Sequence, residues 1–382
     1  MSVRVLVADD SASFGRVLKQ SLETIPRVEV AGLCRDGRAA VERMRRDMPD
    51  LLVLDVEMPE MNGIEVLEVV KRERMKAAVV VVSAAGDRAR ALTMRALDLG
   101  ALDFISKPEG VLADAVAELR SRLAPLVQAV AHRREVQNLL RRDSGVGVQP
   151  PRRAEIPQAT PAAPEKPLTH RIADSQHFAA AASRLVGITG RTKPTMALIG
   201  VSTGGPEALS RVIPKLPADL RVPVLIVQHM PPLFTQNLAA KLDSCSALHV
   251  KEAEDGETAR AGFVYIAPGG KHVKVIAGPQ QQIVMRITSD PPENNCRPAV
   301  DYLFRSVASA FPGRSIAVIL TGMGRDGVAG LQALKSAGCP SIAQDEATCT
   351  VFGMPKEAIS AGVIDIVAPL EEIAGEIAKA VR

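Results

Sequence analysis

Three short segments carry residue types that together could perform nucleophilic hydrolysis. Ser202 lies within Gly200–Gly204, which fits the pattern G-x-S-x-G of a serine on a sharp strand-to-helix turn. His229 directly follows one apolar run, and Asp326 lies in a glycine-rich turn after another. A serine, a histidine and a carboxylate supply a nucleophile, its base and the group that orients the base. If the apolar runs are neighbouring parallel strands, the three side chains meet at one sheet edge.

Each segment also has a plainer interpretation. The turn around Ser202 could bind phosphate or simply join a strand to a helix. A histidine after a strand is usually a hydrogen-bonded structural residue, and Asp326 could be a helix N-cap. His272 is a competing base in the same half of the chain. The order Ser202, His229, Asp326 also differs from the Ser…Asp…His order of the α/β-hydrolases, so the pattern does not indicate that fold.

A second group of polar residues lies near the N-terminus, again after apolar runs. Asp9, Asp10 and Asp55 follow two such runs, Ser83 ends another, and Lys107 follows a fourth. Three carboxylates in one crevice repel each other and are tolerable with a hard cation such as Mg²⁺. A lysine and a hydroxyl beside them could bind the oxygens of a phosphoryl group. The pattern predicts a carboxylate that accepts a phosphoryl group.

Short apolar strands alternate with amphipathic helices in residues 1–125, which predicts a doubly wound parallel α/β sheet. The predicted strands are Val3–Ala8, Val28–Gly32, Leu51–Leu54, Val79–Val82 and Asp103–Ile105, and the predicted helices are 13–23, 36–47, 63–74, 87–99 and 109–123. Ligands in such folds bind beyond the carboxyl ends of the strands, where the acidic residues lie.

The same rhythm returns in residues 194–382 and predicts a second α/β domain. The predicted strands are 196–200, 223–228, 263–267, 273–276, 283–287, 316–320 and 363–366, and the predicted helices are 206–213, 234–242, 298–310, 326–337, 356–361 and 370–381. Residues 126–193 form the predicted linker: 126–142 could continue a helix, and Ser144–Pro167 has the composition of a flexible tether.

Composition narrows the function further. The net charge of +4 comes from a basic excess in the linker, which lacks stacking aromatics and a helix-turn-helix, so nucleic acid is not an expected partner. The five cysteines show no C-x-x-C or metal spacing, which is typical of structural thiols in a reducing compartment. No apolar stretch is long enough to span a bilayer, and acidic residues interrupt the first apolar run, so we expect a cytoplasmic protein without membrane insertion.

On these residues, 1–125 resemble a response-regulator receiver domain. The resemblance implies that Asp55 accepts a phosphoryl group from a histidine kinase. It implies that Mg²⁺ is held by Asp9, Asp10, Asp55 and the backbone carbonyl of Glu57. It further implies three switch residues: the hydroxyl of Ser83, the rotating aromatic Phe104 and the phosphate-binding Lys107.

Residues 194–382 resemble the chemotaxis protein-glutamate methylesterases of the CheB type. The segments that carry the resemblance are Gly200–Pro206, Gln228–Pro231, Tyr265–His272, Arg297–Asp301 and Leu320–Gly327. The resemblance implies Ser202 as nucleophile, His229 as general base and acid, Asp326 as orienter, and an oxyanion hole from the backbone N–H groups of Thr203 and Met323.

The same resemblance implies the substrate. The substrate would be a glutamate γ-methyl ester on a cytoplasmic helix of a chemoreceptor, with glutamine deamidation as a second reaction and no cofactor for the esterase. The architecture adds a separate expectation: both domains carry their sites at loop-rich strand ends and a polymeric substrate needs an open approach to Ser202, so we expect that the unphosphorylated receiver blocks the site and that phosphorylation frees it. The alternative is a receiver-controlled α/β binding or scaffold protein without catalysis; a receiver-controlled transcription factor fits less well, because no recognition helix follows residue 125.

Overall fold

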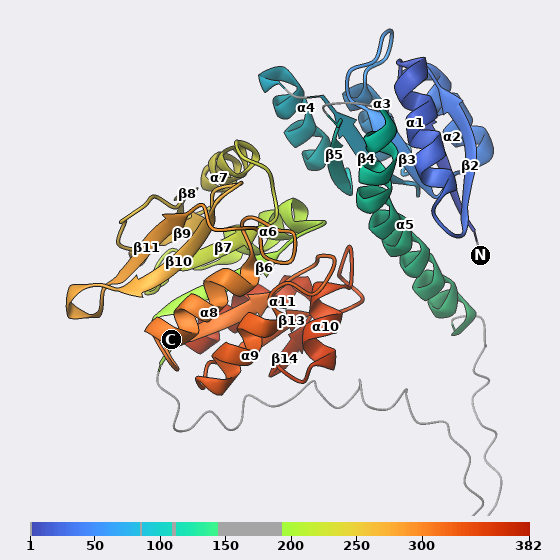
Figure 1. The fold of residues 1–382 in the computed structure, drawn as a ribbon. Coiled ribbons are helices and arrows are strands. Elements are labelled where there is room, and N and C mark those ends of the chain that lie inside the picture. The colour runs from blue at the N-terminus through green and yellow to red at the C-terminus, as the bar shows by residue number, and fades with distance from the viewer. Residues whose placement is uncertain (1, 85, 109–111, 144–192) are drawn as a thin grey trace, which may run out of the picture.

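The computed structural model describes residues 2–84, 86–108, 112–143 and 193–382 (Figure 1). Two parallel-sheet α/β domains make up this part of the chain, in agreement with the expected fold class. The predicted tether, Ser144–Pro167, and the rest of the linker up to residue 192 lie outside the described residues, as does the predicted helix start at 109–111.

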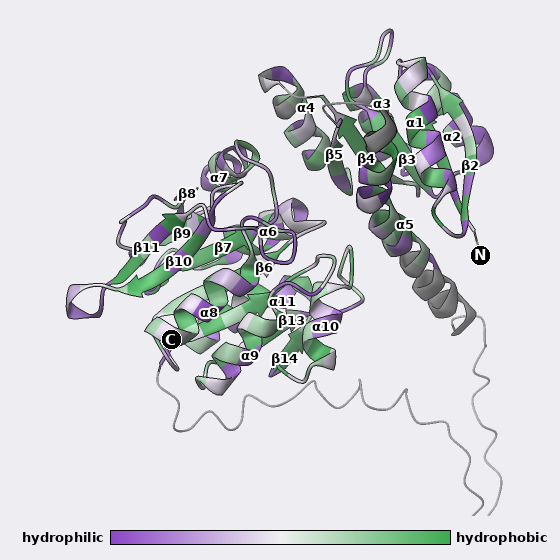
Figure 2. Cartoon of the chain, viewed as in Figure 1, coloured by the Kyte–Doolittle hydropathy of each residue, from purple (hydrophilic) through white to green (hydrophobic). Residues whose placement is uncertain are grey.

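The N-terminal domain is a five-stranded parallel sheet in the order β2-β1-β3-β4-β5, with helices between the strands. Its elements are β1 (Val3–Ala8), α1 (Ala12–Glu23), β2 (Val28–Cys34), α2 (Gly37–Asp47), β3 (Leu51–Asp55), α3 (Gly63–Arg72), β4 (Ala78–Ser83), α4 (Asp87–Asp98), β5 (Asp103–Ser106) and α5 (Leu112–Asp143). Strand β3 is buried throughout because helices cover both faces of the sheet (Figure 2). Helix α5 continues beyond residue 126, as the sequence predicted.

The C-terminal domain is a seven-stranded parallel sheet in the order β14-β13-β12-β6-β7-β9-β8. Its strands are β6 (Met196–Val201), β7 (Val224–Gln228), β8 (His249–Glu252), β9 (Phe263–Ile266), β12 (Ser315–Ile319), β13 (Ser341–Gln344) and β14 (Ile366–Ala368). Its helices are α6 (Gly205–Val212), α7 (Phe234–Cys245), α8 (Val300–Ala310), α9 (Val328–Ser336), α10 (Met354–Ser360) and α11 (Leu370–Val381), with short 3-10 turns at Ile213–Lys215 and Pro279–Gln281.

Three features of this domain differ from the sequence-based expectation. Strands β8 and β13 were not predicted, and the last strand lies at Ile366–Ala368 rather than 363–366. The segments predicted as strands at 273–276 and 283–287 pair with each other outside the main sheet, as the antiparallel hairpin β10 (His272–Ala277) and β11 (Ile283–Thr288). The short link between them excludes a parallel pairing, which needs a connection of about a dozen residues or more.

The two domains touch through the last strand of the first sheet and the helix α7 of the second domain. The ring of Phe104 in β5 stacks on Phe234, with 4.5 Å between the ring centroids. Lys241 on α7 forms an ion pair with Asp98 at the end of α4. The fifth-strand side of the first domain therefore rests on the second domain.

Within the described ranges, no helix combines the length and apolar character needed to cross a membrane.

Candidate hydrolase site

Three adjacent strands bring the predicted triad to one edge of the second sheet. Strand β6 lies between β12 and β7, and all three run parallel. Ser202 follows β6, His229 follows β7, and Asp326 lies in the turn after β12. The parallel order of the strands thus places at one edge three residues that are far apart in the sequence, as the sequence analysis expected.

Glycines make the sharp turn at Ser202 possible. Gly204 adopts φ +75°, and a Cβ atom there would lie 2.4 Å from the Cβ of Thr350. Gly322, in the turn after β12, packs so closely that an added Cβ would lie 2.8 Å from the Cβ of Ser202. The backbone of Ser202 is fixed at both ends, because its N–H donates to the Thr321 carbonyl at 3.0 Å and its carbonyl accepts from Gln228 Nε2 at 2.9 Å. The half-buried Ser202 side chain is therefore presented by a rigid turn.

Asp326 is the hub of a buried hydrogen-bond network. Its Oδ2 atom lies 2.7 Å from His229 Nε2 and accepts the N–H of Val300 at 2.6 Å, while Oδ1 accepts the N–H of Asp301 at 3.0 Å. Val300 and Asp301 begin helix α8, so Asp326 caps a helix that is remote in sequence. The capping role that the sequence suggested for Asp326 thus concerns α8 and not the helix that follows it, since the N-cap of α9 is Gly327.

The pair formed by His229 and Asp326 is electrostatically matched. Burial disfavours a charged imidazole, but the hydrogen bonds of Asp326 and Cys296 outweigh it and raise the pKa of His229 to about 9. Burial also opposes ionisation of Asp326, yet the His229 partner and the α8 N–H groups lower the pKa of that carboxyl. The resting pair is thus an imidazolium facing a carboxylate at neutral pH.

The nitrogen of His229 that remains available to Ser202 is Nδ1, because Nε2 faces Asp326. Among the described residues, the hydroxyl of Ser202 makes no hydrogen bond to His229 in this docked form; instead the Sγ atom of Cys296 lies 3.7 Å from Nδ1. Sequence reasoning missed Cys296, since no motif connects it with a histidine 67 residues away.

The two backbone N–H groups predicted to form an oxyanion hole, those of Thr203 and Met323, donate to no protein acceptor in the described part of the chain. Both lie in turns that meet at Ser202, because Gly322 packs against that residue. Their role as oxyanion donors stays a prediction.

His272, the competing base, is fully buried and structural. Its Nε2 atom lies 3.1 Å from the Pro291 carbonyl, and its Nδ1 atom accepts the N–H of Ala299 at 3.3 Å. Its ring stacks on Tyr302, with centroids 4.4 Å apart. Both nitrogens are engaged, so His272 has none to offer a serine.

The acidic cluster of the first domain assembles as the sequence predicted. Ligand atoms of Asp9, Asp10 and Asp55 lie within 4.8 Å of one another at the carboxyl edge of the sheet. Lys107 Nζ lies 2.7 Å from Asp55 Oδ2 and 3.1 Å from Asp9 Oδ2. The Asp9 atom is buried and receives no hydrogen bond of good geometry. Hard oxygen ligands around an under-bonded carboxylate oxygen fit Mg²⁺.

Lys107 and the backbone of Glu57 contact this cluster, and Ser83 ends the neighbouring strand β4. Burial raises the pKa of Asp9, whereas for Lys107 the carboxylates of Asp55 and Asp9 outweigh burial and raise its pKa. The N–H of Glu57 donates to Asp55 Oδ1 at 3.1 Å, so its backbone lies beside the acceptor carboxylate. The hydroxyl of Ser83 is buried and lies 3.4 Å from the backbone carbonyls of Ala84, in the following turn, and Ala89, in the first turn of α4.

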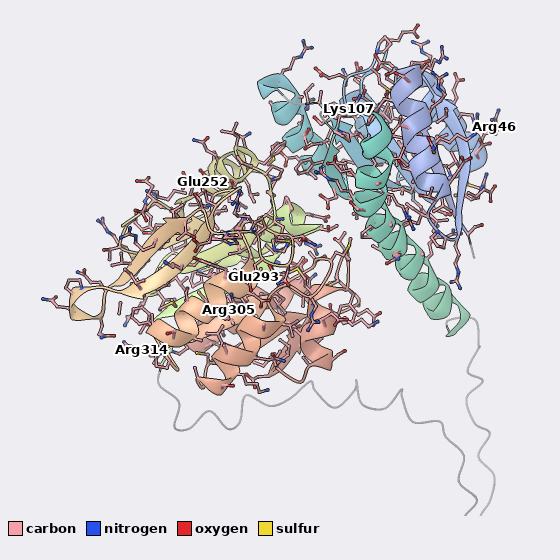
Figure 3. The ribbon with its side chains drawn as sticks, viewed as in Figure 1. Arg46, Lys107, Glu252, Glu293, Arg305 and Arg314 are labelled. Atoms are coloured by element: carbon pink, nitrogen blue, oxygen red, sulfur yellow. The ribbon has the colours of Figure 1, made fainter. Side chains whose placement is uncertain are left out.

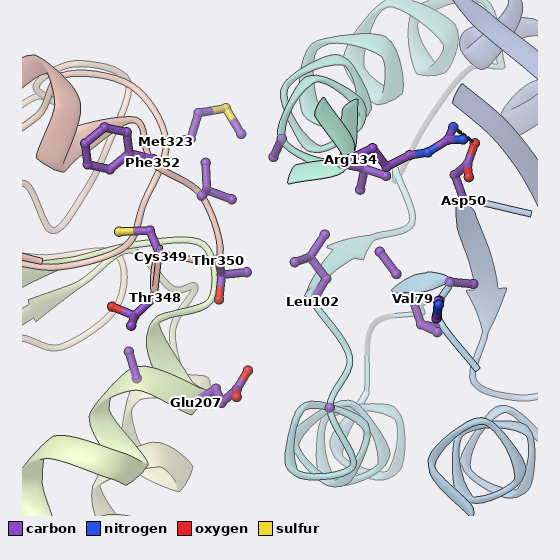
Figure 4. A pocket seen from close by; sticks show the side chains of 18 of the residues that line it. Asp50, Val79, Leu102, Arg134, Glu207, Met323, Thr348, Cys349, Thr350 and Phe352 are labelled. Atoms are coloured by element: carbon purple, nitrogen blue, oxygen red, sulfur yellow. Dashed lines mark hydrogen bonds and ion pairs between the residues drawn. The ribbon is translucent and has the colours of Figure 1, made fainter. Parts of the chain in front are cut away.

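The first domain contacts the turn that carries Ser202. Thr203 Oγ1 donates to Asp103 Oδ2 at 2.7 Å, and burial at this contact raises the pKa of Asp103. A cleft of about 1940 Å³ separates the domains nearby, with Met323 and Thr350 on one wall and Leu102 and Arg134 on the other (Figure 4). Neither Ser202 nor His229 lines this cleft. In the docked form the wide approach between the domains therefore stops short of the serine.

Comparisons with known proteins agree with both halves of this description. Residues 197–377 match the family model of the CheB methylesterase, and residues 5–117 match that of the response regulator receiver domain. A protein-glutamate methylesterase/protein-glutamine glutaminase of Desulfotalea psychrophila is 42% identical over 100% of this chain and 99% of its own length. The protein of the same name from Bacillus subtilis is 39% identical over 100% and 99%.

Among solved structures, the CheB methylesterase catalytic domain of Thermotoga maritima is 45% identical, with a TM-score of 0.48, and the match covers 49% of this chain and 99% of that one. The response regulator domain of Thermotoga maritima CheB is 37% identical, with a TM-score of 0.29, over 32% of this chain and 93% of that one.

Proposed function

The chain belongs to the CheB methylesterase family and carries a receiver domain ahead of its catalytic domain; on this premise we propose that it hydrolyses glutamate γ-methyl esters on the cytoplasmic helices of chemoreceptors. The observation that carries the proposal is the pairing of His229 with Asp326 beside the Ser202 turn. The proposed substrate places the enzyme in the cytoplasm, where a histidine kinase would supply the phosphoryl group for the receiver.

The proposed chemistry is acyl transfer through Ser202. Neutral His229 takes the hydroxyl proton on Nδ1 while the serine oxygen attacks the ester carbonyl, and Asp326 holds the ring and stabilises the imidazolium that forms. The N–H groups of Thr203 and Met323 stabilise the oxyanion. His229 then protonates the departing methoxide, so methanol leaves, and water cleaves the acyl-enzyme by the same route to release glutamate.

The same groups support glutamine deamidation as a second reaction. An amide carbonyl enters the oxyanion site in place of the ester carbonyl, and His229 protonates the leaving nitrogen, which departs as ammonia. The acyl-enzyme is the same γ-glutamyl ester of Ser202 in both reactions. The proposal for this chain is supported by the names of its relatives, which include protein-glutamine glutaminase.

The receiver is proposed to regulate this site through Asp55. Asp9, Asp10, Asp55 and the Glu57 carbonyl would hold Mg²⁺, which offsets the charge of the phosphoryl oxygens when bound. Lys107 and Ser83 would bind those oxygens, drawing Ser83 away from its backbone partners. Phe104, three residues before Lys107, stacks on Phe234, so its movement would weaken the docked arrangement. Release of Asp103 from Thr203 would then open the approach to Ser202.

Methanol release from a methylated chemoreceptor fragment tests the proposal. We expect release by the wild-type chain and a loss on the order of 10⁴-fold or more in Ser202→Ala, as for other triad nucleophiles. Undiminished release by a folded Ser202→Ala protein would refute the serine mechanism. Receptor binding without any methanol release by the wild-type chain would support the alternative of a non-catalytic scaffold.

A further inference from the structure

Cys296 and His229 form a pair whose spacing suits a metal ion. The Sγ atom lies 3.7 Å from Nδ1, and ligand atoms of His229, Cys296 and Asp326 lie within 4.8 Å of one another. In tetrahedral zinc sites, zinc–nitrogen bonds of about 2.0–2.1 Å and zinc–sulfur bonds of about 2.3 Å separate the two ligand atoms by about 3.6 Å. The observed spacing matches that value without movement of either side chain.

The imidazole is already oriented for such an ion. Asp326 Oδ2 lies 2.7 Å from Nε2, so a neutral His229 keeps its proton on Nε2 and directs the Nδ1 lone pair toward Cys296. A carboxylate on the far nitrogen is the usual support of a zinc-bound histidine, because it fixes the tautomer and the ring orientation. The ring is 13% exposed, so the site is shielded but accessible to a small ion.

The thiol is held by an equally rigid turn. The backbones of Glu293 and Cys296 exchange two hydrogen bonds, of 3.0 and 2.8 Å, around Asn294 and Asn295, which both adopt positive φ. Arg305 on α8 grips the Glu293 carboxylate through two contacts of 2.5 and 2.6 Å (Figure 3).

The turn is also tied to the hydrolase site itself. Asn294 Nδ2 donates to Asp326 Oδ1 at 3.0 Å, so the loop that carries Cys296 and the residue that orients His229 share one network. The His229 ring and the backbone turn that carries Cys296 are therefore both fixed by hydrogen bonds of the same network.

We propose that His229 and Cys296 bind a zinc-class divalent cation, and that this ion inhibits the hydrolase site by occupying the imidazole nitrogen that Ser202 needs. The inhibitory role rests on the proposed function. Binding replaces the thiol proton of Cys296 and any proton on Nδ1, which both pass to solvent, and water completes the coordination. Affinity therefore rises with pH, as at other thiolate sites.

Cadmium titration of the chelator-treated full-length chain tests the site directly, because a cadmium–thiolate bond gives an ultraviolet charge-transfer band that carboxylates do not. Cys245 is exposed, so Cys245→Ser is the background for all variants. We expect one saturable band in this background and its loss in Cys296→Ser. The midpoint in His229→Gln should be weaker by at least 10- to 100-fold, since loss of even an outer-shell partner of a metal ligand costs about that much. Zn²⁺ should displace Cd²⁺, and Ser202→Ala should keep the band.

Methanol release in the presence of Zn²⁺ tests the inhibition, with each protein compared with its own metal-free rate. We expect Cys296→Ser to need at least about tenfold more Zn²⁺ for half-inhibition than the wild-type chain. Both proteins keep the receiver carboxylates, so cation binding there cannot account for the difference. Circular dichroism checks that each variant is folded. A band that persists in Cys296→Ser, or no band at all, would refute the metal site and leave a thiol–imidazole hydrogen bond.

Equal sensitivity of the wild-type chain and Cys296→Ser to Zn²⁺ would refute the inhibitory role. A Cys296-dependent band in a chain without esterase activity would refute the proposed function but support the metal site.

Discussion

Replacing Phe104 by alanine should raise the activity of the unphosphorylated chain. Phe104 stacks on Phe234 across the domain contact, 4.5 Å between centroids, and is half-buried there. Truncation removes this contact from the docked form and leaves the hydrolase site, on the other domain, unchanged. If docking occludes Ser202, the population of the open form and the turnover rise together.

The size of the effect follows from the contact. An aromatic pair contributes about 0.5–1.5 kcal/mol beyond its area. Burial of part of the ring at the contact contributes roughly another 1 kcal/mol to docking, about half the value for a fully buried side chain. A total of about 2 kcal/mol changes the ratio of docked to open forms by roughly 30-fold, at about 1.4 kcal/mol per tenfold. Turnover should increase up to that factor, limited by the rate of the fully open enzyme.

Initial rates of methanol release, without phosphodonor, measure this effect. Lys241→Ala is the matched control at the same contact, since its partly exposed ion pair with Asp98 should contribute only about 0–1 kcal/mol. Its rate should therefore rise at most about fivefold. Unchanged or slower turnover of a folded Phe104→Ala chain would refute occlusion by the receiver.

Three further predictions follow from the two sites. Asp55→Asn should abolish labelling by a small-molecule phosphodonor, whereas the wild-type chain should be labelled only with Mg²⁺; chelator-resistant labelling would contradict the metal assignment. Because the pKa of His229 is raised to about 9, turnover of the unphosphorylated chain should climb as pH rises toward that value. The folding stability that the imidazolium gains from Asp326 should be fully present below about pH 6.5 and lost as the pH rises through about 9. Urea unfolding of wild type and Asp326→Asn across this range measures the effect, and parallel stability curves would contradict it. Gly322→Ala should lower turnover on the order of 10²-fold with the fold intact, because the new Cβ would lie 2.5 Å from Met354 Sδ and 2.8 Å from Ser202 Cβ and must displace the serine turn; normal kinetics would show that the turn has room.

The fold was predictable where strands are long, apolar runs. Strands such as β3 and β6 are buried on both faces of the sheet, so they appear in the sequence as continuous apolar runs. Strand β13 was missed because it is four residues long and has polar ends. Those ends also have distant partners, since the N–H of Ser341 donates to Asp365 and Gln344 Oε1 accepts the N–H of Thr321.

The site was predictable as far as strand ends carry it. Ser202, His229 and Asp326 follow parallel strands, so their shared edge could be inferred from the sequence alone. The residues that contact this triad and its turn from elsewhere in the chain could not be predicted. Cys296 reaches His229 through a separate turn, and the Asp103 contact to Thr203 depends on how two domains dock. Such contacts leave no periodicity or spacing in the sequence.

Mass spectrometry of the covalent intermediate tests the central claim most directly. The chain would be mixed with a methylated receptor peptide, quenched in acid during turnover and digested. Our account predicts a γ-glutamyl adduct on the peptide that contains Ser202, and none in Ser202→Ala. An adduct on Cys296, whose thiol also lies beside His229, or turnover without any adduct on Ser202, would contradict it.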